Sequence, residues 1–213
     1  MRCDKMDLLL YGVTDRSWLG DRTLAQQVEA SLRGGATMIQ LREKHMDRGS
    51  ILAQALELRE LCGRYGVPLI LNDDAELAQA AGADGVHVGQ SDMEAGRVRA
   101  LLGEDKLIGV SARTVEQALA AQAAGADYLG VGAMFPTGTK QDTRPVSYDT
   151  LKAICAAVDI PVVAIGGIGA GNVAELAGSG IAGVAVVSAL YAQPDVEAAT
   201  RSLRAQVERV VGP

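Results

Sequence analysis

The sequence AGADGVHV occupies residues 81–88, and AGADYLGV occupies residues 124–131. The same pattern recurs as GGATMIQL at residues 34–41 and, more loosely, as SGIAGVAVV at residues 179–187. In each segment, glycine is typical of the left-handed turn that ends a helix. The apolar run that follows has the length of a buried parallel strand. The pattern therefore predicts four places where a helix ends and a strand begins.

Other apolar runs complete a set of eight predicted strands. Two of these runs follow the pairs Val67-Pro68 and Ile160-Pro161. Helical patterns such as Leu24–Leu32 and Val115–Ala124 lie between the runs, and this alternation predicts a parallel sheet with right-handed crossovers. The predicted strands are Leu8–Val13, Thr37–Leu41, Pro68–Asn72, Gly85–Val88, Leu107–Val110, Tyr128–Val131, Val162–Ile165 and Gly183–Val187.

Eight strand–helix pairs in 213 residues predict the α/β fold class and, within it, a small (β/α)8 TIM barrel. The alternative is an open doubly wound sheet, which usually has fewer strands. No linker or low-complexity stretch interrupts the pattern, so residues 1–213 are expected to form a single domain. The segment from Asp195 to Val211 is expected to be a closing helix capped by Asp195. In such barrels the active site lies at the carboxyl-terminal ends of the strands, so the residues that follow each strand are the candidates.

Composition excludes several classes of function. The net charge is −6, and aromatic residues make up only 3% of the chain. A basic or base-stacking nucleic-acid surface is therefore not expected. The three cysteines are scattered and there are only two histidines, so a Cys/His zinc cluster is not expected either.

No apolar stretch is long enough to cross a bilayer, and the amino-terminal residues lack a signal-peptide pattern. We therefore expect a cytoplasmic protein with no membrane partner and with reduced cysteines.

The second predicted strand ends in a run of polar residues, Gln40-Leu41-Arg42-Glu43-Lys44. Strand side chains alternate, so Gln40, Arg42 and Lys44 are expected to project to one side. An amide and two cations at a barrel mouth are typical of a diphosphate site. The alternative is a solvated strand end in which Arg42 pairs with Glu43 or another neighbour.

Carboxylates follow the third and fourth strands. Asn72-Asp73-Asp74 follows one strand, and Gly89-Gln90-Ser91-Asp92 follows the next. Adjacent strands lie roughly 5 Å apart, so Asp73 and Asp92 could face one ion. One or two carboxylates plus substrate phosphates are the usual ligands of Mg²⁺. The alternative for each acid is a helix cap.

His87 and Ser111 lie in or near the barrel wall. A histidine at such a position is usually a satisfied interior group, and we assign it no role. Ser111 follows the fifth strand, where its hydroxyl could cap the next helix, hold a phosphate, or do both.

Residues 132–147 form a long stretch after the sixth strand without helical or strand periodicity. Loops of this length are usually functional. The stretch contains Pro136-Thr137-Gly138-Thr139-Lys140, whose hydroxyls, glycine and lysine are suited to gripping an anion. The spacing is not that of a Walker A loop.

Glycines and a serine follow the last two strands. The seventh strand is followed by Gly166-Gly167-Ile168-Gly169, and the eighth by Val187-Ser188. Loops at these two places commonly form the phosphate site of such barrels through backbone N–H groups. The sequence therefore predicts two anion sites in one mouth, which indicates transfer of a group from a diphosphate to a monophosphate.

These motifs, in this order, resemble the thiamine-phosphate synthase (thiamine-phosphate pyrophosphorylase) family over nearly the whole chain. The matching segments are QLREK at 40–44, NDD at 72–74, HVGQSD at 87–92, VSAR at 110–113, PTGTK at 136–140, DTR at 142–144, GGI at 166–168 and VVS at 186–188.

The resemblance implies an enzyme that joins hydroxymethylpyrimidine diphosphate to a thiazole phosphate, giving thiamine phosphate and diphosphate with Mg²⁺ as cofactor. It implies that Asp73 and Asp92 bind the metal. The residues implied to hold the pyrimidine diphosphate are Gln40, Leu41, Arg42, Glu43, Lys44, Asn72, Ser111 and Lys140. The residues implied to hold the thiazole phosphate are Thr137, Gly138, Thr139, Gly167, Val187 and Ser188.

Within that set, Arg42, Lys44, Ser111 and Lys140 are the candidate catalytic residues. Cations and a metal neutralise the charge that develops on a leaving diphosphate. An electron-rich aminopyrimidine stabilises a benzyl-like cation, which favours a dissociative path, and the thiazole nitrogen carries no proton, so no general base is needed.

Two other functions remain open from the sequence. One is a thiazole tautomerase-like paralogue on the same barrel, and the other is a phosphate-metabolite binding protein without catalysis. Retention of the QLREK segment together with Asp73, Asp92 and Lys140 favours the synthase. The sequence is compatible with a monomer and with a small homo-oligomer.

Overall fold

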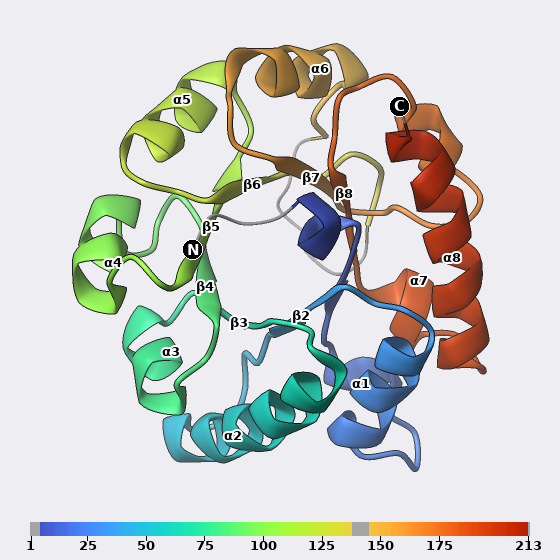
Figure 1. The fold of residues 1–213 in the computed structure, drawn as a ribbon. Helices are drawn as coiled ribbons and strands as arrows, with labels where there is room; N and C mark the ends of the chain where they lie inside the picture. Colours follow the sequence, from blue (N-terminus) through green and yellow to red (C-terminus); the bar gives the residue numbers. More distant parts are fainter. Residues whose placement is uncertain (1–4, 138–144, 213) are drawn as a thin grey trace.

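The computed structural model describes residues 5–137 and 145–212. Eight parallel strands form a closed barrel in which each strand pairs with the next along the chain and β8 pairs with β1 (Figure 1). The predicted (β/α)8 barrel is confirmed, and the open-sheet alternative is wrong. The strands are β1 (Leu10–Val13), β2 (Met38–Leu41), β3 (Leu69–Asn72), β4 (Gly85–Val88), β5 (Leu107–Ala112), β6 (Tyr128–Gly132), β7 (Val162–Ile165) and β8 (Gly183–Val186).

Helices surround the barrel (Figure 1). The α-helices are α1 (Leu24–Arg33), α2 (Arg48–Tyr65), α3 (Ala75–Ala81), α4 (Ala95–Leu102), α5 (Val115–Ala123), α6 (Tyr148–Ala157), α7 (Ser188–Tyr191) and α8 (Val196–Val211). The 3-10 helices are η1 (Lys5–Leu8), η2 (Arg16–Trp18) and η3 (Val173–Leu176). Between β7 and β8, the crossover is made by the single turn η3 rather than by a full α-helix.

The repeated glycine pattern works as the sequence predicts. Gly35, Gly82, Gly125 and Gly180 all have positive φ, between +62° and +98°. Glycine adopts this conformation without the steric penalty that a Cβ atom brings. The chain can therefore leave each helix and turn directly into the next strand.

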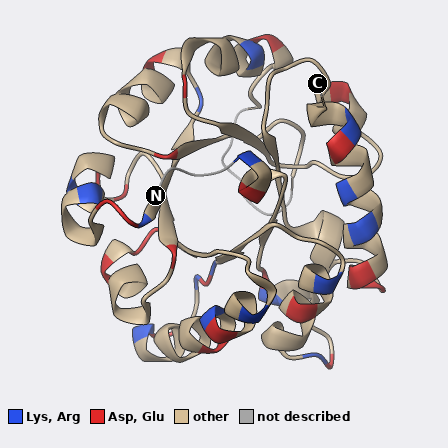
Figure 2. Cartoon of the chain, in the orientation of Figure 1, with Lys and Arg blue, Asp and Glu red and all other residues tan. Residues whose placement is uncertain are grey.

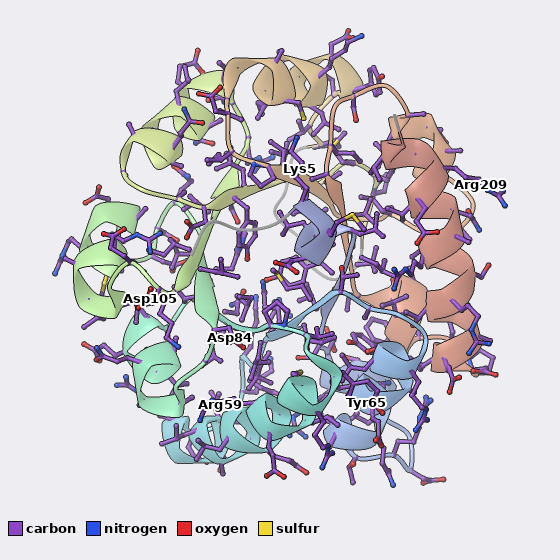
Figure 3. The ribbon with its side chains drawn as sticks, viewed as in Figure 1. Lys5, Arg59, Tyr65, Asp84, Asp105 and Arg209 are labelled. Carbon is purple, nitrogen blue, oxygen red and sulfur yellow. The ribbon has the colours of Figure 1, made fainter. Side chains whose placement is uncertain are left out.

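The residue after each glycine-alanine pair adds a second constraint. Asp84 Oδ2 accepts a hydrogen bond from the backbone N–H of Leu69 at 2.9 Å, and Asp127 Oδ2 accepts one from Ile108 at 2.8 Å (Asp84 is labelled in Figure 3). Thr37 Oγ1 likewise accepts a hydrogen bond from the backbone N–H of Leu10, the first residue of β1, at 2.9 Å. Each side chain thus ties the start of its own strand to the start of the preceding strand, which fixes the register between them.

Side-chain caps begin six of the α-helices. In each, a side-chain oxygen accepts a hydrogen bond from a backbone N–H of the first turn, as is usual for this position. The predicted cap of the closing helix by Asp195 is confirmed. The capping residues are Thr23, Asp47, Asp74, Thr114, Ser147 and Asp195.

Apolar side chains pack in two layers because strand residues alternate in direction. The outer layer lies between strands and helices and includes Ile39 and Leu129. The inner layer fills the barrel and includes Tyr11, Met38 and Tyr128. Helix η1 lies within the ring of strands, where Leu8 is fully buried (Figure 1).

The first strand begins later than predicted. The run from Leu8 was expected to be extended throughout, but Leu8 ends η1 and β1 starts at Leu10. An apolar run cannot distinguish a strand residue from one that turns inward to fill the end of the barrel.

Charged residues lie mostly on the surrounding helices and loops (Figure 2). Among the described residues, no helix combines the length and apolar character needed to cross a membrane.

Candidate active site

Because all eight strands are parallel, their carboxyl ends open at the same end of the barrel. This is the end at which such barrels carry their active sites. The loops after β2 to β8 contain most of the residues that the sequence singled out. The fold therefore brings segments far apart in the sequence to one mouth.

Gln40 and Leu41 end β2 and point to opposite sides. Gln40 is only 4% exposed, and its Nε2 donates to the Tyr11 hydroxyl inside the barrel at 2.6 Å. Leu41 packs in the outer layer, against the helices. At the mouth, Leu41 can therefore contribute only backbone atoms.

Arg42, Glu43 and Lys44 follow the strand rather than extend it. Because β2 ends at Leu41, the expected alternation of Gln40, Arg42 and Lys44 stops at the first of them, and that prediction is wrong. Beyond Leu41 the backbone N–H of Arg42 donates to Thr14 Oγ1 at 3.0 Å. This contact leads the chain out of the β-ladder.

The charged residues of this segment have different partners. Arg42 lies 3.8 Å from an oxygen of Asp15, whereas Glu43 pairs with Arg16 at 2.6 Å. Pairing of Arg42 with a neighbour, the alternative expected from the sequence, is therefore present. An ion pair at that distance contributes little, so Arg42 can exchange it for a phosphate. Lys44 is exposed.

The two acids after β3 have separate tasks. Asp74 Oδ1 accepts a hydrogen bond from Leu77 N and caps α3. Asp73 has φ of +66°, and its N–H donates to the carbonyl of His87 at 2.8 Å. A non-glycine residue in this conformation carries strain of the kind that gathers at functional sites. The cap alternative therefore holds for Asp74 and is wrong for Asp73.

Asp92 closes the loop after β4. Its Oδ2 accepts a hydrogen bond from Gly89 N at 2.7 Å, and the residue is exposed. The cap alternative is wrong here as well, because Glu94 occupies the N-cap position of α4. Strands β3 and β4 pair directly, so Asp73 and Asp92 follow neighbouring strands.

The chemistry of the two carboxylates determines whether they suit a metal ion. No group of three or more His, Cys, Asp or Glu residues that could hold a metal occurs among residues 5–137 and 145–212. Mg²⁺ commonly takes only one or two carboxylates and fills its other positions with water and substrate phosphates. A pair such as Asp73 and Asp92 fits that requirement and does not fit a site made by the protein alone.

Ser111 lies inside β5, two residues closer to the mouth than Gly109 on the same face. Its hydroxyl lies 2.9 Å from His87 Nε2, and its carbonyl accepts a hydrogen bond from Gln90 Nε2 at 2.7 Å. Thr114, not Ser111, caps α5. The helix-cap role considered for Ser111 is therefore wrong, whereas the expectation of a hydrogen-bonded interior His87 is confirmed.

Two residues of the barrel interior, Tyr11 and Tyr128, are not among the candidates drawn from the sequence. Their hydroxyls lie 3.0 Å apart, and the Tyr128 hydroxyl lies 3.2 Å from His87 Nδ1. Both rings are fully or almost fully buried. A signal was present, because a tyrosine inside an otherwise apolar strand needs a partner for its hydroxyl.

The segment after β6 is tied to the end of β7 on its outward path and to its own first residue on its return path. Met134 N donates to the carbonyl of Ile165, and Phe135 N donates to that of Gly166, both at 3.0 Å. On the return path Val146 N donates to the carbonyl of Ala133 at 2.8 Å. Thr137 is partly exposed, and the predicted site residues Gly138, Thr139 and Lys140 lie outside the described residues.

Glycine at position 167 allows the loop after β7 to lie against the segment after β6. Its φ is +68°, and a Cβ atom there would lie 2.5 Å from the carbonyl oxygen of Pro136. Asn172 braces the same loop: its Oδ1 accepts from Gly169 N, and its Nδ2 donates to the carbonyl of Gly167, both at 2.9 Å. The loop is therefore shaped by its own side chain before any ligand is present.

A cavity of about 260 Å³ lies between this loop and the start of α7. Gly167, Asn172 and Ser188 contribute to its lining. Val187 has a partly buried side chain that packs against the inner layer of the barrel. Its backbone occupies the N-cap position of α7. The predicted phosphate residues Gly167 and Ser188 are thus brought together, with Val187 beside them.

The two described cysteines are poor nucleophiles. Burial raises the pKa of the Cys62 thiol to about 12 and that of Cys155 to about 11. The thiolate is the reactive form of cysteine. Neither residue is therefore a candidate for covalent catalysis near neutral pH.

Comparison with known proteins shows close relatives over almost the full length. A family described as "Thiamine monophosphate synthase" matches residues 10–190. Proteins named thiamine-phosphate synthase are 48% identical in Ruminiclostridium cellulolyticum, over 93% of this chain and 95% of that protein, and 50% identical in Chloroflexus aurantiacus, over 95% and 94%. The solved structure of a thiamine phosphate pyrophosphorylase from Pyrococcus furiosus is similar, with a TM-score of 0.90, 38% identity and coverage of 98% and 99%.

Proposed function

The chain belongs to the thiamine monophosphate synthase family and acts as a thiamine-phosphate synthase, a transferase; from this premise we propose how its residues divide the work. The proposal rests on one observation. The polar ends of β2 to β5 and the glycine-rich ends of β7 and β8 open at the same end of one closed barrel. A donor with a diphosphate and an acceptor with a monophosphate can therefore meet in one mouth. Neither a tautomerase nor a binding protein without catalysis receives support from the named relatives.

The donor in this proposal is hydroxymethylpyrimidine diphosphate. Gln40 to Lys44, Asn72, Ser111 and Lys140 hold it, with Leu41 acting through its backbone. Arg42 supports this assignment because its long contact with Asp15 leaves the guanidinium free to bind phosphate oxygens bidentately. Lys44 and Lys140 add positive charge. These three cations stabilise the charge that develops on the leaving diphosphate.

Asp73 and Asp92 are the residues that would hold Mg²⁺. When bound, Mg²⁺ would neutralise part of the diphosphate charge and so make diphosphate a better leaving group. The Asp92 carboxylate already accepts a hydrogen bond from Gly89 N, and the backbone N–H of Asp73 donates to the carbonyl of His87. The backbone that carries these two carboxylates is therefore fixed in advance, which lowers the cost of ordering the site on binding.

The acceptor is a thiazole phosphate held by Thr137, Gly138, Thr139, Gly167, Val187 and Ser188. The braced loop at Gly167 and the cavity beside Ser188 support this part of the proposal. Backbone N–H groups in glycine-rich turns of this kind bind phosphate oxygens well. The segment after β6 packs against this loop, since Phe135 N donates to the carbonyl of Gly166 and Pro136 lies against Gly167.

In the proposed reaction, the bond between the pyrimidine methylene carbon and the diphosphate oxygen breaks, and its electron pair leaves with diphosphate. The thiazole nitrogen then donates its lone pair to the methylene carbon, which gives thiamine phosphate. No proton is transferred, so no general base is required. The protein supplies electrostatic stabilisation through Arg42, Lys44 and Lys140 and orientation through the barrel mouth.

Two further points complete the proposal. We assign residues 1–213 to one barrel domain without a nucleic-acid partner, as a monomer or a small homo-oligomer. We also place the enzyme in the cytoplasm, since the described cysteines, Cys62 and Cys155, are unpaired and a reducing compartment keeps thiols in that state.

An end-point coupling assay tests the function. Purified protein is mixed with hydroxymethylpyrimidine diphosphate, thiazole phosphate and Mg²⁺, and thiamine phosphate and diphosphate are both measured, with EDTA as control. We expect equal amounts of both products and none with EDTA. A folded protein that binds thiazole phosphate but forms neither product would overturn the proposal.

A further inference from the structure

Two neighbouring loops at the mouth are joined residue by residue. Directly after β2, the backbone N–H of Arg42 donates to Thr14 Oγ1 at 3.0 Å, and Arg42 Nη1 lies 3.8 Å from Asp15 Oδ2. The next residue, Glu43, accepts a hydrogen bond at Oε1 from Arg16 Nε at 2.6 Å. Three consecutive residues after β1 thus meet two consecutive residues after β2. We call these residues, Thr14, Asp15, Arg16, Arg42 and Glu43, the loop junction.

The two ion pairs of the loop junction are unequal. The contact between Arg16 and Glu43 is a short, charge-assisted hydrogen bond, which is the stronger kind. Arg42 and Asp15 lie beyond hydrogen-bond distance, so their pair contributes little. Arg16 and Glu43 therefore form the stronger side-chain link between the loops. Arg42, beside them, can exchange Asp15 for a phosphate.

Glu43 is the more buried member of its pair. Its side chain is only 5% exposed, whereas that of Arg16 is 39% exposed. Arg16 Nη2 also donates to Gln54 Oε1, so the guanidinium bridges Glu43 and helix α2. A carboxylate at this depth is costly without a compensating charge. Arg16 supplies that charge.

The loop that carries Arg16 is anchored by contacts of its own. Asp15 Oδ1 accepts a hydrogen bond from Ser17 N at 2.8 Å and caps η2. At the other end of η2, the fully buried side chain of Gln27 donates from Nε2 to the carbonyl of Trp18 at 3.0 Å. The Arg16 side chain therefore extends from backbone that is already ordered, and it can hold Glu43 in a defined place.

Charge determines what Glu43 can do at the mouth. A carboxylate and a diphosphate repel each other, so an uncompensated Glu43 would oppose binding of the donor. It would also compete with the diphosphate for the adjacent cation, Arg42. When Arg16 neutralises Glu43, the positive charge of Arg42 remains available to the substrate.

We propose that Glu43 is a positioning residue for Arg42. Paired with Arg16, it closes the loop junction and holds the Arg42 guanidinium at the mouth, and it touches neither the diphosphate nor the metal. The inference rests on the proposed function, because that function places the diphosphate at Arg42. It deepens that function by giving Glu43 an indirect part in binding the donor.

Two substitutions and their combination test the proposal. The KM for the pyrimidine diphosphate is measured in the wild type, in Arg16→Met, in Glu43→Gln and in the double variant. Arg16→Met leaves the Glu43 carboxylate uncompensated, and we expect this KM to rise by about tenfold. Glu43→Gln replaces the ion pair by a neutral hydrogen bond, and the expected rise is about threefold.

The double variant decides between an indirect and a direct role. With neither charge present, nothing competes for Arg42, so we expect a KM about threefold above that of the wild type. Glu43→Gln would then weaken the wild type and partly rescue Arg16→Met. A KM as high as that of Arg16→Met, or higher, would overturn the proposal, because Glu43 would then act on the substrate or the metal independently of Arg16.

The second substrate separates this role from a merely structural one. The KM for thiazole phosphate is expected to change little in Arg16→Met, since that substrate is assigned to the ends of β7 and β8. The matched control is Arg201→Met, which removes the arginine of a 2.7 Å pair with Glu197 in the outer helix α8 (Figure 1). We expect both KM values to be unchanged in this control. Equal rises of both KM values in Arg16→Met, or a fall in Tm without any change in KM, would overturn the proposal.

Binding of inorganic diphosphate is a second measurement that needs no turnover. Titration calorimetry with diphosphate and Mg²⁺ is expected to give Kd values for the four proteins in the same order as the KM values. A wild type that binds diphosphate but forms no thiamine phosphate would overturn the proposed function, and the order of the Kd values would still decide the role of Glu43. A wild type that binds no diphosphate would overturn both. If Arg16→Met does not fold, the double variant is compared with Glu43→Gln, and a large further loss of affinity would overturn the inference.

Discussion

The side chain of Asn172 holds the carbonyl of Gly167 at 2.9 Å and so fixes the turn that follows β7. Its other amide atom accepts from Gly169 N at the same distance. One side chain therefore satisfies both a donor and an acceptor of the loop. The loop faces the cavity that we assign to the thiazole phosphate.

Loss of that brace is expected to weaken binding of the thiazole phosphate. In Asn172→Ala both hydrogen bonds disappear, which corresponds to about 1–2 kcal/mol and a roughly tenfold higher KM for this substrate. Asn172→Asp is expected to be worse, since it places a carboxylate against the Gly167 carbonyl and near the phosphate. Steady-state kinetics with each substrate varied in turn provides the test. An unchanged KM for thiazole phosphate in both variants would contradict it.

Removal of Asp92 is expected to abolish most activity. Asp92→Ala loses the negative charge and the hydrogen bond to Gly89 N, and turnover is expected to fall by at least about a hundredfold. Asp92→Asn keeps an acceptor for Gly89 and removes only the charge, so a similar loss would assign the effect to the metal. The control Asp105→Ala changes an acid that precedes β5, at the opposite end of the barrel from the loop after β4, and is expected to be neutral. Near-normal turnover of Asp92→Ala in magnesium buffer would remove Asp92 from the metal site.

Lys140 is expected to act on the diphosphate and not on the fold. The residue lies outside the described part of the chain, so this prediction depends on its charge and on the family resemblance alone. Lys140→Ala is expected to raise KM for the pyrimidine diphosphate or lower kcat, with little change in Tm. Kinetics and thermal unfolding of the same preparation decide it. A large fall in Tm with intact turnover would show the opposite.

Space beside His87 and Tyr128 is expected to matter for both stability and rate. Gly109→Ala inserts a methyl group where the nearest atom would lie 2.2 Å away, so overpacking is expected to cost about 1–3 kcal/mol in the free energy of unfolding and to lower kcat. Gly63→Ala is the matched change in helix α2, where no atom lies within 4 Å, and helix propensity predicts a gain of up to about 1 kcal/mol. Urea unfolding measures both. Equal effects of the two substitutions would show that the interior space is not needed.

Alkaline pH is expected to destabilise the fold through Cys62. Burial raises the pKa of this thiol to about 12 in the folded chain, whereas the unfolded chain has an ordinary value near 9. The folded state therefore binds more protons between these two values, and the stabilising contribution present below pH 9 is lost as pH rises toward 12. The slope from this one group is at most about 1.4 kcal/mol per pH unit.

The comparison is made with Cys62→Ala. Urea unfolding between pH 8 and the highest pH at which the wild type folds is expected to give a shallower loss of stability in the variant. Other buried groups add to the wild-type slope, including Tyr191, whose pKa burial also raises. The same slope in both proteins would exclude Cys62 as a contributor.

Sequence patterns anticipated the barrel because each of them depends on local physics. Glycine after a helix, an apolar run of strand length and a capping acid such as Asp195 each describe a few consecutive residues. Eight apolar runs with helical patterns between them leave few arrangements other than a closed parallel barrel. The resemblance through QLREK, Asp73 and Asp92 added the chemistry, which no single motif could supply.

Other features depended on contacts between distant segments. Leu8 belongs to an apolar run, but it turns into the barrel because the end of the barrel interior must be filled. Ser111 follows a strand pattern and precedes a helix, yet it pairs with His87 on the neighbouring strand and leaves the cap to Thr114. The expected alternation of side chains through Arg42 is wrong, because the Arg42 N–H bonds to the Thr14 hydroxyl and not to a backbone carbonyl of the β-ladder.

The sequence by itself determined the barrel, its open end and the charged and glycine-rich segments that meet there, since these follow from periodicity and from the order of the elements. Only the tertiary structure decided that Gln40, Tyr11 and Tyr128 lie in one line with His87 and Ser111. The register between neighbouring strands selects these partners, and the absence of a Cβ atom at Gly109 gives them room. Residues separated by up to 117 positions share a hydrogen bond here, and no pattern of nearby residues encodes such a distance.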